Sequence, residues 1–236
     1  MFDPLVHVSW SAGASWLAGI AVAAFLVSWI LSDIRPTRRV FYIPVLALAT
    51  GALTGAYLVW SDAGSSFWTN HWAYGFVGAA VAGGFLAVLL IRQRVPGTKP
   101  HAVSALTLGW DGLVYGAAEG VLLSVLPVVV TWQMLFSNGW TNGWREVAAG
   151  GLAIVASVAV IVIHHLGYPE FRGRMMARAV LGCGVLSIAY LLTASVIAPI
   201  LAHAVLHTVI VRNGWELPPH EQRHVPMSIE GAPGRA

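Results

Sequence analysis

The chain has 236 residues, of which 57% are apolar and only 10% are charged, and its mean hydropathy is +0.72. Soluble domains carry about 25% charged residues, so this composition excludes an ordinary water-soluble domain as well as a disordered chain. A single cysteine, Cys183, excludes an intrachain disulfide scaffold. We therefore expect an all-α integral membrane protein, because apolar runs of this length form spanning helices rather than barrel strands.

Seven apolar runs follow one another, each long enough for a spanning helix of about 20 residues. They cover residues 12–32, 41–60, 72–92, 105–132, 147–165, 175–192 and 194–211. Only the Thr193-Ala194-Ser195 step separates the last two runs. The pattern divides the chain into three amino-terminal helices (1–104), a four-helix core (105–211) and a polar cytoplasmic tail (212–236), which we expect to be partly disordered.

The basic residues indicate an orientation. Twelve of the thirteen follow the first, third, fifth or seventh run, and only Arg145 lies on the opposite side. Because basic residues stay in the cytoplasm during insertion, this distribution predicts a multi-pass protein of the cell membrane with its amino terminus outside and its carboxyl terminus inside. If the last two runs formed a single helix, the arginines of the tail would lie outside the cell, which the preference of basic residues for the cytoplasm disfavours. The basic residues at the cytoplasmic ends of the runs also account for the net charge of +3. We therefore expect no nucleic-acid partner.

Tryptophan and glycine add two further patterns. The tryptophans that gather at the predicted outer boundary, as in an aromatic belt, are Trp10, Trp60, Trp68, Trp72, Trp132, Trp140 and Trp144. In the fourth run, Gly112, Gly116 and Gly120 recur at every fourth position. Small residues at this spacing let another helix approach closely, so the fourth run is expected at the centre of the bundle.

Glu119 is the one carboxylate that lies deep within a run. A charged side chain at mid-bilayer costs at least about 2.5 kcal/mol, so a buried ionisable residue is a functional hypothesis by default. Asp111 lies nearer the cytoplasmic end of the same run. We interpret Asp111 as a contact to the headgroup region or as a cap at the helix start.

Four histidines lie in the runs that could face Glu119. His203 and His207 are four residues apart and share a helical face, whereas only one of His164 and His165 can face the interior, and the other is expected to meet water at the interface. The predicted orientation lets Glu119, His165 and His203 converge in the cytoplasmic half of the bundle. Two chemistries fit. A glutamate and a histidine can activate a water without a cofactor, or the four groups Glu119, His165, His203 and His207 can hold a zinc ion.

Three segments carry these residues in a recognisable pattern: AEGVLLS at 118–124, IVIHHLG at 161–167 and APILAHA at 198–204. They resemble the three motifs of the CAAX protease and bacteriocin-processing (Abi) family of intramembrane endopeptidases, and the resemblance extends over residues 105–211. It implies hydrolysis of a peptide bond in a membrane-associated peptide or protein substrate. By position, Glu119 and His165 would activate the water, while His203, with His207 in place of an asparagine, would stabilise the oxyanion.

The first motif departs from the family pattern. Gly120 stands where a second glutamate is expected, and Ser124 stands where an arginine is expected. The alternative is therefore a catalytically inactive membrane subunit or scaffold of a larger complex that keeps the fold without the chemistry. A covalent retinal protein is excluded, because the only lysine, Lys99, lies between runs. Haem ligation by the histidines would leave Glu119 without a role.

Overall fold

The fold is a bundle of helices. The computed structural model describes residues 7–32, 38–92 and 103–213, and these ranges contain helices and no strand. The long helices are α1 (Trp10–Ser32), α2 (Arg38–Ser61), α4 (Trp72–Arg92), α8 (Gly143–Leu166), α9 (Arg174–Thr193) and α10 (Ile197–Arg212). Two short helices, α3 (Ser66–Thr69) and η3 (Pro169–Phe171), lie in the connections. The prediction of an all-α fold is confirmed.

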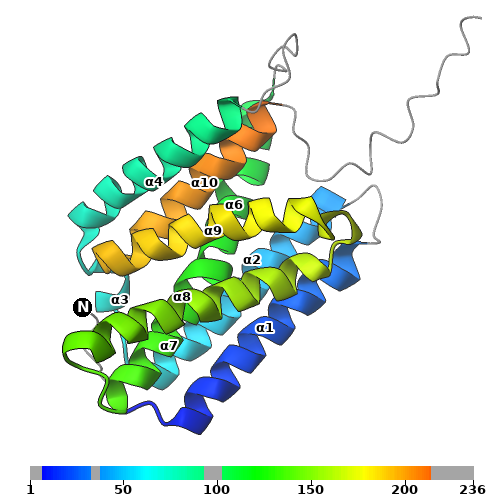
Figure 1. Cartoon of the computed structure of the whole chain (residues 1–236). Coiled ribbons are helices and arrows are strands. Elements are labelled where there is room, and N and C mark those ends of the chain that lie inside the picture. Colours follow the sequence, from blue (N-terminus) through cyan, green and yellow to red (C-terminus); the bar gives the residue numbers. More distant parts are fainter. Residues whose placement is uncertain (1–6, 33–37, 93–102, 214–236) are drawn as a thin grey trace, which may run out of the picture.

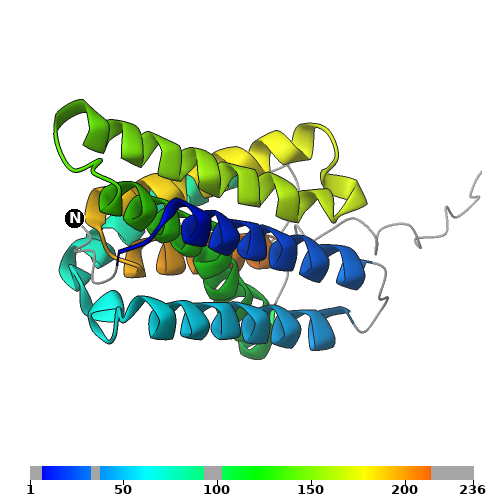
Figure 2. The same cartoon turned by 90° about the horizontal axis from the view of Figure 1, so that it is seen from below.

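One further helix runs without a break from Ala105 to Ser137, and we call it the central helix. Its segments are α5 (Ala105–Thr107), η1 (Leu108–Val114), α6 (Tyr115–Glu119), η2 (Gly120–Val125) and α7 (Leu126–Ser137), of which η1 and η2 are π-helical. The other helices surround it (Figures 1 and 2). It is longer than the predicted run, which ended at residue 132.

Among the described residues, six helical segments are long and apolar enough to cross a membrane: α1, α2, α4, the central helix, α8 and α9. The seventh, α10, is apolar but has only 16 residues. The expected break between the last two runs is present. Ala194 adopts a left-handed backbone with φ of 50°, which ends α9 at Thr193, and α10 begins at Ile197.

The glycines of the central helix lie against α10. A Cβ atom at Gly116 would be 2.8 Å from the Cα of Ala204, and one at Gly112 would be 3.0 Å from the Cα of Thr208. Distances this short leave no room for a side chain, so the two backbones touch. The predicted role of this stripe is confirmed, and its partner is the helix that carries His203 and His207.

A second set of glycines, not recognised from the sequence, packs α4 against the other side of α10. A Cβ at Gly83 would be 3.2 Å from the Cα of Ala202, and one at Gly78 would be 3.1 Å from the Cβ of Ala198. The contact partner moves from Ala198 to Ala202 as the chain advances from Gly78 to Gly83, so α4 and α10 run in the same direction (Figure 1). Helix α10 is therefore held between α4 and the central helix.

The bundle exposes apolar side chains and buries polar ones. Leu48 of α2, Val81 of α4 and Val155 of α8 are 72%, 67% and 62% exposed. In the interior, the Ser157 hydroxyl donates to the carbonyl oxygen of Leu123 at 2.6 Å and shares a hydrogen bond of 2.7 Å with Ser187. Apolar side chains outside and hydrogen-bonded polar side chains inside are the arrangement expected for a bundle whose surface faces hydrocarbon rather than water.

The alternating helices bring like residues to the same end of the bundle. Arg92, Arg174 and Arg212 lie at or near one end of their helices, whereas Arg145 lies at the start of α8, at the opposite end. The predicted belt tryptophans occur at the Arg145 end, and Trp10, Trp60, Trp68, Trp72 and Trp144 are well exposed. Trp132 is only 3% exposed and belongs to the core instead, because its position on α7 faces the bundle axis.

The hydrophobic core continues across the predicted boundary at residue 104. Ile20 of α1 and Leu46 of α2 belong to the same buried cluster as Leu122, Ile161 and Tyr190. The first two helices thus pack directly on the region expected to form the functional core. Of the predicted tail, only Arg212 and Asn213 lie within the described residues, so the expectation of partial disorder in the tail falls outside them.

We predict that Gly116→Ala destabilises the protein by about 1–3 kcal/mol, because the added methyl group would push α10 away from the central helix. The measurement is thermal unfolding in detergent. Gly51→Ala is the matched control, since a Cβ at Gly51 would meet no atom within 4 Å; its higher helix propensity should leave stability unchanged or raise it by up to about 1 kcal/mol. Equal effects of the two substitutions would contradict close packing at Gly116.

Candidate functional site

Glu119 lies between the two π-helical segments of the central helix. The α-helical piece α6 is only five residues long, with η1 before it and η2 after it. A π turn contains an extra residue, so it changes the direction of every side chain that follows, and such turns occur frequently at functional sites. Within α6, Tyr115 and Glu119 are four residues apart and share one face.

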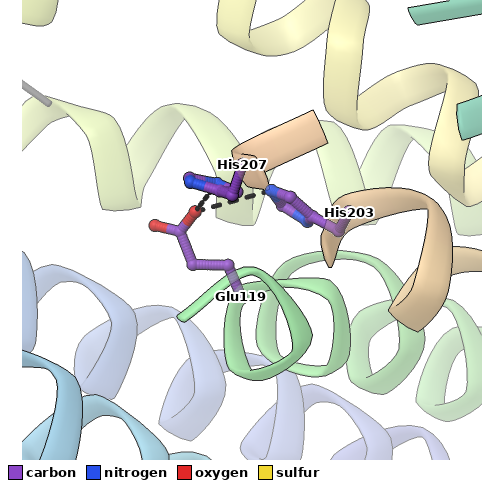
Figure 3. A group of neighbouring side chains, drawn as sticks. All are labelled: Glu119, His203 and His207. Atoms are coloured by element: carbon purple, nitrogen blue, oxygen red, sulfur yellow. Dashed lines mark ion pairs between the residues drawn. The ribbon is translucent and has the colours of Figure 1, made fainter. Parts of the chain in front are cut away.

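Both carboxylate oxygens of Glu119 have partners. Oε1 accepts a hydrogen bond of 2.6 Å from the Tyr115 hydroxyl and lies 3.1 Å from Nε2 of His164 on α8. Oε2 lies 2.9 Å from Nε2 of His207 and 3.5 Å from Nε2 of His203, both on α10. Figure 3 shows these two imidazoles next to each other at the carboxylate. One side chain therefore joins the central helix to α8 and α10.

This cluster is enclosed. Glu119 is 3% exposed, and His164, His203 and His207 are 0%, 1% and 4% exposed. The ring of Tyr115 closes one side and lies perpendicular to the ring of His207, at 4.6 Å between centroids. An enclosed carboxylate is costly unless it is hydrogen-bonded, and here one hydroxyl and three imidazoles provide the bonds.

The neighbours of His164 determine where its protons lie. Its Nδ1 is 2.8 Å from the carbonyl oxygen of Ala24, which can only accept a hydrogen bond, so Nδ1 carries a hydrogen. The contact between Nε2 and Oε1 of Glu119 then needs one more proton, shared by the two groups. The pair is either an imidazolium with a carboxylate or a neutral imidazole with a carboxylic acid. In both states it holds a transferable proton, which general acid–base catalysis requires.

His203 and His207 direct one nitrogen each toward the same oxygen. Their Nε2 atoms face Oε2 of Glu119, and their Nδ1 atoms have no hydrogen-bond partner within the described ranges. A neutral imidazole that donates from Nε2 has only a lone pair at Nδ1, so this tautomer leaves no buried N–H group unpaired. Two N–H donors that converge on one oxygen atom can stabilise an oxyanion.

The structure thus brings together Glu119, His203 and His207, as the sequence analysis expected. It does not place His165 among the groups that bond to Glu119, and His164 occupies that position instead. Neighbouring residues of an α-helix point about 100° apart, so only one of the two histidines can reach the carboxylate. The rotation of α8 about its own axis decides which of the two histidines does so, and that rotation is set by packing against the other helices.

His165 is buried as well, at 6% exposed. The expectation that one of the two adjacent histidines meets water at the interface is therefore wrong. Its Nδ1 lies 2.8 Å from the carbonyl oxygen of Ile161, one turn earlier in α8. Its ring packs on Phe171, at 4.6 Å between centroids.

The structure differs from the sequence-based expectation at two further residues, Asp111 and Tyr115. Asp111 is buried and does not cap the central helix, because Ser104 does so by accepting a 3.1 Å hydrogen bond from the backbone N–H of Thr107. Tyr115 was missed as a partner of Glu119. Its spacing was the available signal, since a tyrosine four residues before a buried glutamate lies on the same helical face.

The structure gives a steric reason for one departure from the family pattern. A Cβ atom at Gly120 would lie 3.0 Å from the carbonyl oxygen of Pro199 and 3.2 Å from the Cβ of His203, so a side chain at this position would crowd α10. Ser124 is fully buried, and its hydroxyl has no hydrogen-bond partner among the described residues.

Comparisons of the chain with protein-family models, with curated proteins and with solved structures gave no match.

Proposed function

We propose that this protein is an intramembrane endopeptidase that hydrolyses a peptide bond of a membrane-associated substrate. The observation that carries the proposal is the arrangement around Glu119, in which His164 shares a proton with one carboxylate oxygen and two imidazoles of α10 converge on the other. The resemblance of the three segments to the CAAX protease and bacteriocin-processing family supports it, with His164 in place of His165 as the activating histidine.

In the proposed reaction, the ionised carboxylate of Glu119 removes a proton from a water molecule whose oxygen attacks the scissile carbonyl carbon. The negative charge moves to the carbonyl oxygen, which replaces Oε2 as the acceptor of the His203 and His207 N–H groups. As the C–N bond breaks, the leaving amine takes a proton from the Glu119 and His164 pair. No cofactor is needed, and the protons balance.

We predict that Glu119→Gln and His164→Ala each lower peptide hydrolysis by about 10²–10⁴-fold, because each removes a member of the proton-transfer pair. His165→Ala is the matched neighbour and should stay within a few-fold of the wild type. The measurement is cleavage of a membrane-peptide library by purified protein in proteoliposomes, with new termini identified by mass spectrometry.

Unchanged hydrolysis in Glu119→Gln would overturn the proposed mechanism. A wild-type protein that cleaves no member of the library, while Glu119→Gln preserves both cellular phenotype and assembly with a co-purifying partner, would favour the alternative of a non-catalytic membrane subunit or scaffold. A greater loss in His165→Ala than in His164→Ala would restore the assignment made from the sequence.

The second candidate is a zinc-dependent hydrolase, because one ligand atom from each of Glu119, His203 and His207 lies within 4.8 Å of the other two. Tetrahedral zinc with bonds of about 2.0–2.1 Å separates its ligand atoms by roughly 3.3 Å, and the two imidazole distances to Oε2 are 2.9 and 3.5 Å. A bound zinc ion would supply Lewis acidity. Metal-bound histidines usually donate their other N–H to a partner, whereas the Nδ1 atoms of His203 and His207 have none among the described residues.

We expect the purified protein to contain less than one zinc ion per chain, because the α10 histidines lack these supporting hydrogen bonds. Elemental analysis of protein purified without chelators measures this directly. A content of one zinc per chain in the wild type that disappears in His203→Ala and persists in His165→Ala would establish the metal-dependent alternative.

We propose further that the protein crosses the cell membrane seven times, with its amino terminus outside and the arginine-rich end of the bundle in the cytoplasm. The arginines at the helix ends support this orientation, and α10 would form the seventh crossing despite its length.

The orientation predicts that Asn142→Cys reacts with a membrane-impermeant maleimide in intact cells, whereas Arg172→Cys reacts only after permeabilisation. Both positions are exposed and lie at opposite ends of α8 and its flanking turns. The wild type is the background control, because its one cysteine, Cys183, is buried. Reversed labelling would show the opposite orientation.

A further inference from the structure

A serine of α8 supplies a hydrogen bond that a proline removes from the central helix. In an α-helix, the carbonyl oxygen of Leu123 would accept from the backbone N–H of residue 127, four positions later. Residue 127 is a proline and has no N–H group. The Ser157 hydroxyl donates to this carbonyl oxygen instead, at 2.6 Å. Leu123 and Ser157 are both 0% exposed, so solvent does not replace the serine as a donor.

A second buried serine, Ser187 of α9, determines the direction of these hydrogen bonds. Its hydroxyl oxygen lies 2.7 Å from that of Ser157 and 3.1 Å from the carbonyl oxygen of Cys183. Two hydroxyl hydrogens are thus shared among three contacts, and the two shortest contacts require them. Because a carbonyl group cannot donate, Ser157 donates to Leu123 and Ser187 donates to Ser157. The hydroxyl of Ser187 thereby polarises that of Ser157 and strengthens its bond to the central helix.

Ser157 and His164 lie on the same face of α8. Seven residues separate them, which is nearly two turns, so their side chains point about 20° apart, whereas His165 points about 80° away from Ser157. Ser157 bonds to the central helix at Leu123, within the π-helical segment that follows Glu119, and His164 bonds to it at Glu119 itself. A rotation of α8 about its axis that broke the first contact would therefore also move the second.

We propose that the hydrogen bond from Ser157 fixes the rotation of α8 about its own axis and thereby directs His164 to Glu119. Pro127 makes this bond necessary, because it offers no backbone N–H to the carbonyl oxygen of Leu123. Ser157 is a positioning residue that acts through α8. Its effect on hydrolysis rests on the proposed peptidase function, whereas the placement of His164 can be measured without any substrate.

The first test is a double-mutant cycle of Ser157→Ala and Pro127→Ala, measured by reversible unfolding of the full-length protein in mixed detergent micelles. We expect Ser157→Ala alone to lower the ratio of folded to unfolded protein by about 10- to 100-fold, because it leaves a buried carbonyl oxygen unpaired. In the Pro127→Ala background, residue 127 regains its N–H group, so the same serine substitution should lower the ratio by less than about threefold.

Ser124→Ala is the matched control for this cycle. Ser124 is another fully buried serine, and its hydroxyl has no hydrogen-bond partner in the described part of the chain. Its substitution should therefore have the same effect with and without Pro127→Ala. An equal loss from Ser157→Ala in both backgrounds, including a failure of both variants to fold, would overturn the proposal.

The second test follows the imidazole of His164 by ¹⁵N NMR of histidine-labelled protein in detergent, with its signals identified by their loss in His164→Gln. The variant that carries both Ser157→Ala and Pro127→Ala regains stability but lacks the bond between α8 and the central helix. We expect its His164 signals to shift, whereas Ser124→Ala should leave them in place. A role of Ser157 in stability alone would not move these signals, so wild-type signals in the folded double variant would overturn the proposed positioning.

Peptide hydrolysis by the double variant connects this placement to the proposed function. We expect kcat to fall about three- to tenfold with KM unchanged, because a displaced proton donor slows the chemical step and leaves substrate binding intact. An unchanged kcat despite shifted His164 signals would overturn the role of Ser157 in hydrolysis. Shifted signals in a protein whose wild type has no peptidase activity would refute the proposed function and leave the positioning of His164 established.

Discussion

A carboxylate can remain inside an apolar bundle only if hydrogen-bond donors occupy its oxygens, and this requirement shapes the structure around Glu119. The donors come from three different helices. Tyr115 belongs to the same turn, His164 lies near the end of α8, and two histidines of α10 reach the other oxygen. Because removing any of these helices would leave a buried polar group unpaired, the site and the helix packing depend on each other.

Glycine makes this arrangement possible, because the imidazoles of α10 reach Glu119 only when the two helix backbones are in contact. Gly112, Gly116 and Gly120 provide that contact on one side of α10, and Gly78 and Gly83 of α4 support the opposite side. A lipid-facing protein gains little from hydrophobic attraction between helices, so close backbone packing and buried hydrogen bonds must hold it together.

The sequence was sufficient for the features that repeat along a helix or depend on composition. Apolar runs predicted the long helices, and four-residue spacing predicted both the glycine contact with α10 and the shared face of His203 and His207. The choice between His164 and His165 was not accessible, because it depends on the rotation of α8 within the bundle. The burial of Trp132 also depends on helix rotation. Its residue type and its position along the helix are those of a belt tryptophan, but its side chain faces the interior of the bundle. The π turns beside Glu119 also leave no clear mark in the apolar pattern.

The short length of α10 has a consequence for the surrounding lipid. A helix of 16 residues is about 24 Å long, whereas the hydrocarbon core of a bilayer is about 30 Å thick. In the proposed topology with seven crossings, lipids beside this helix would compress or tilt to cover it, which would draw their headgroups inward. The thinnest part of the surrounding bilayer would then lie next to the helix that carries His203 and His207, so water and polar chain segments would have a shorter distance to travel there than anywhere else around the bundle.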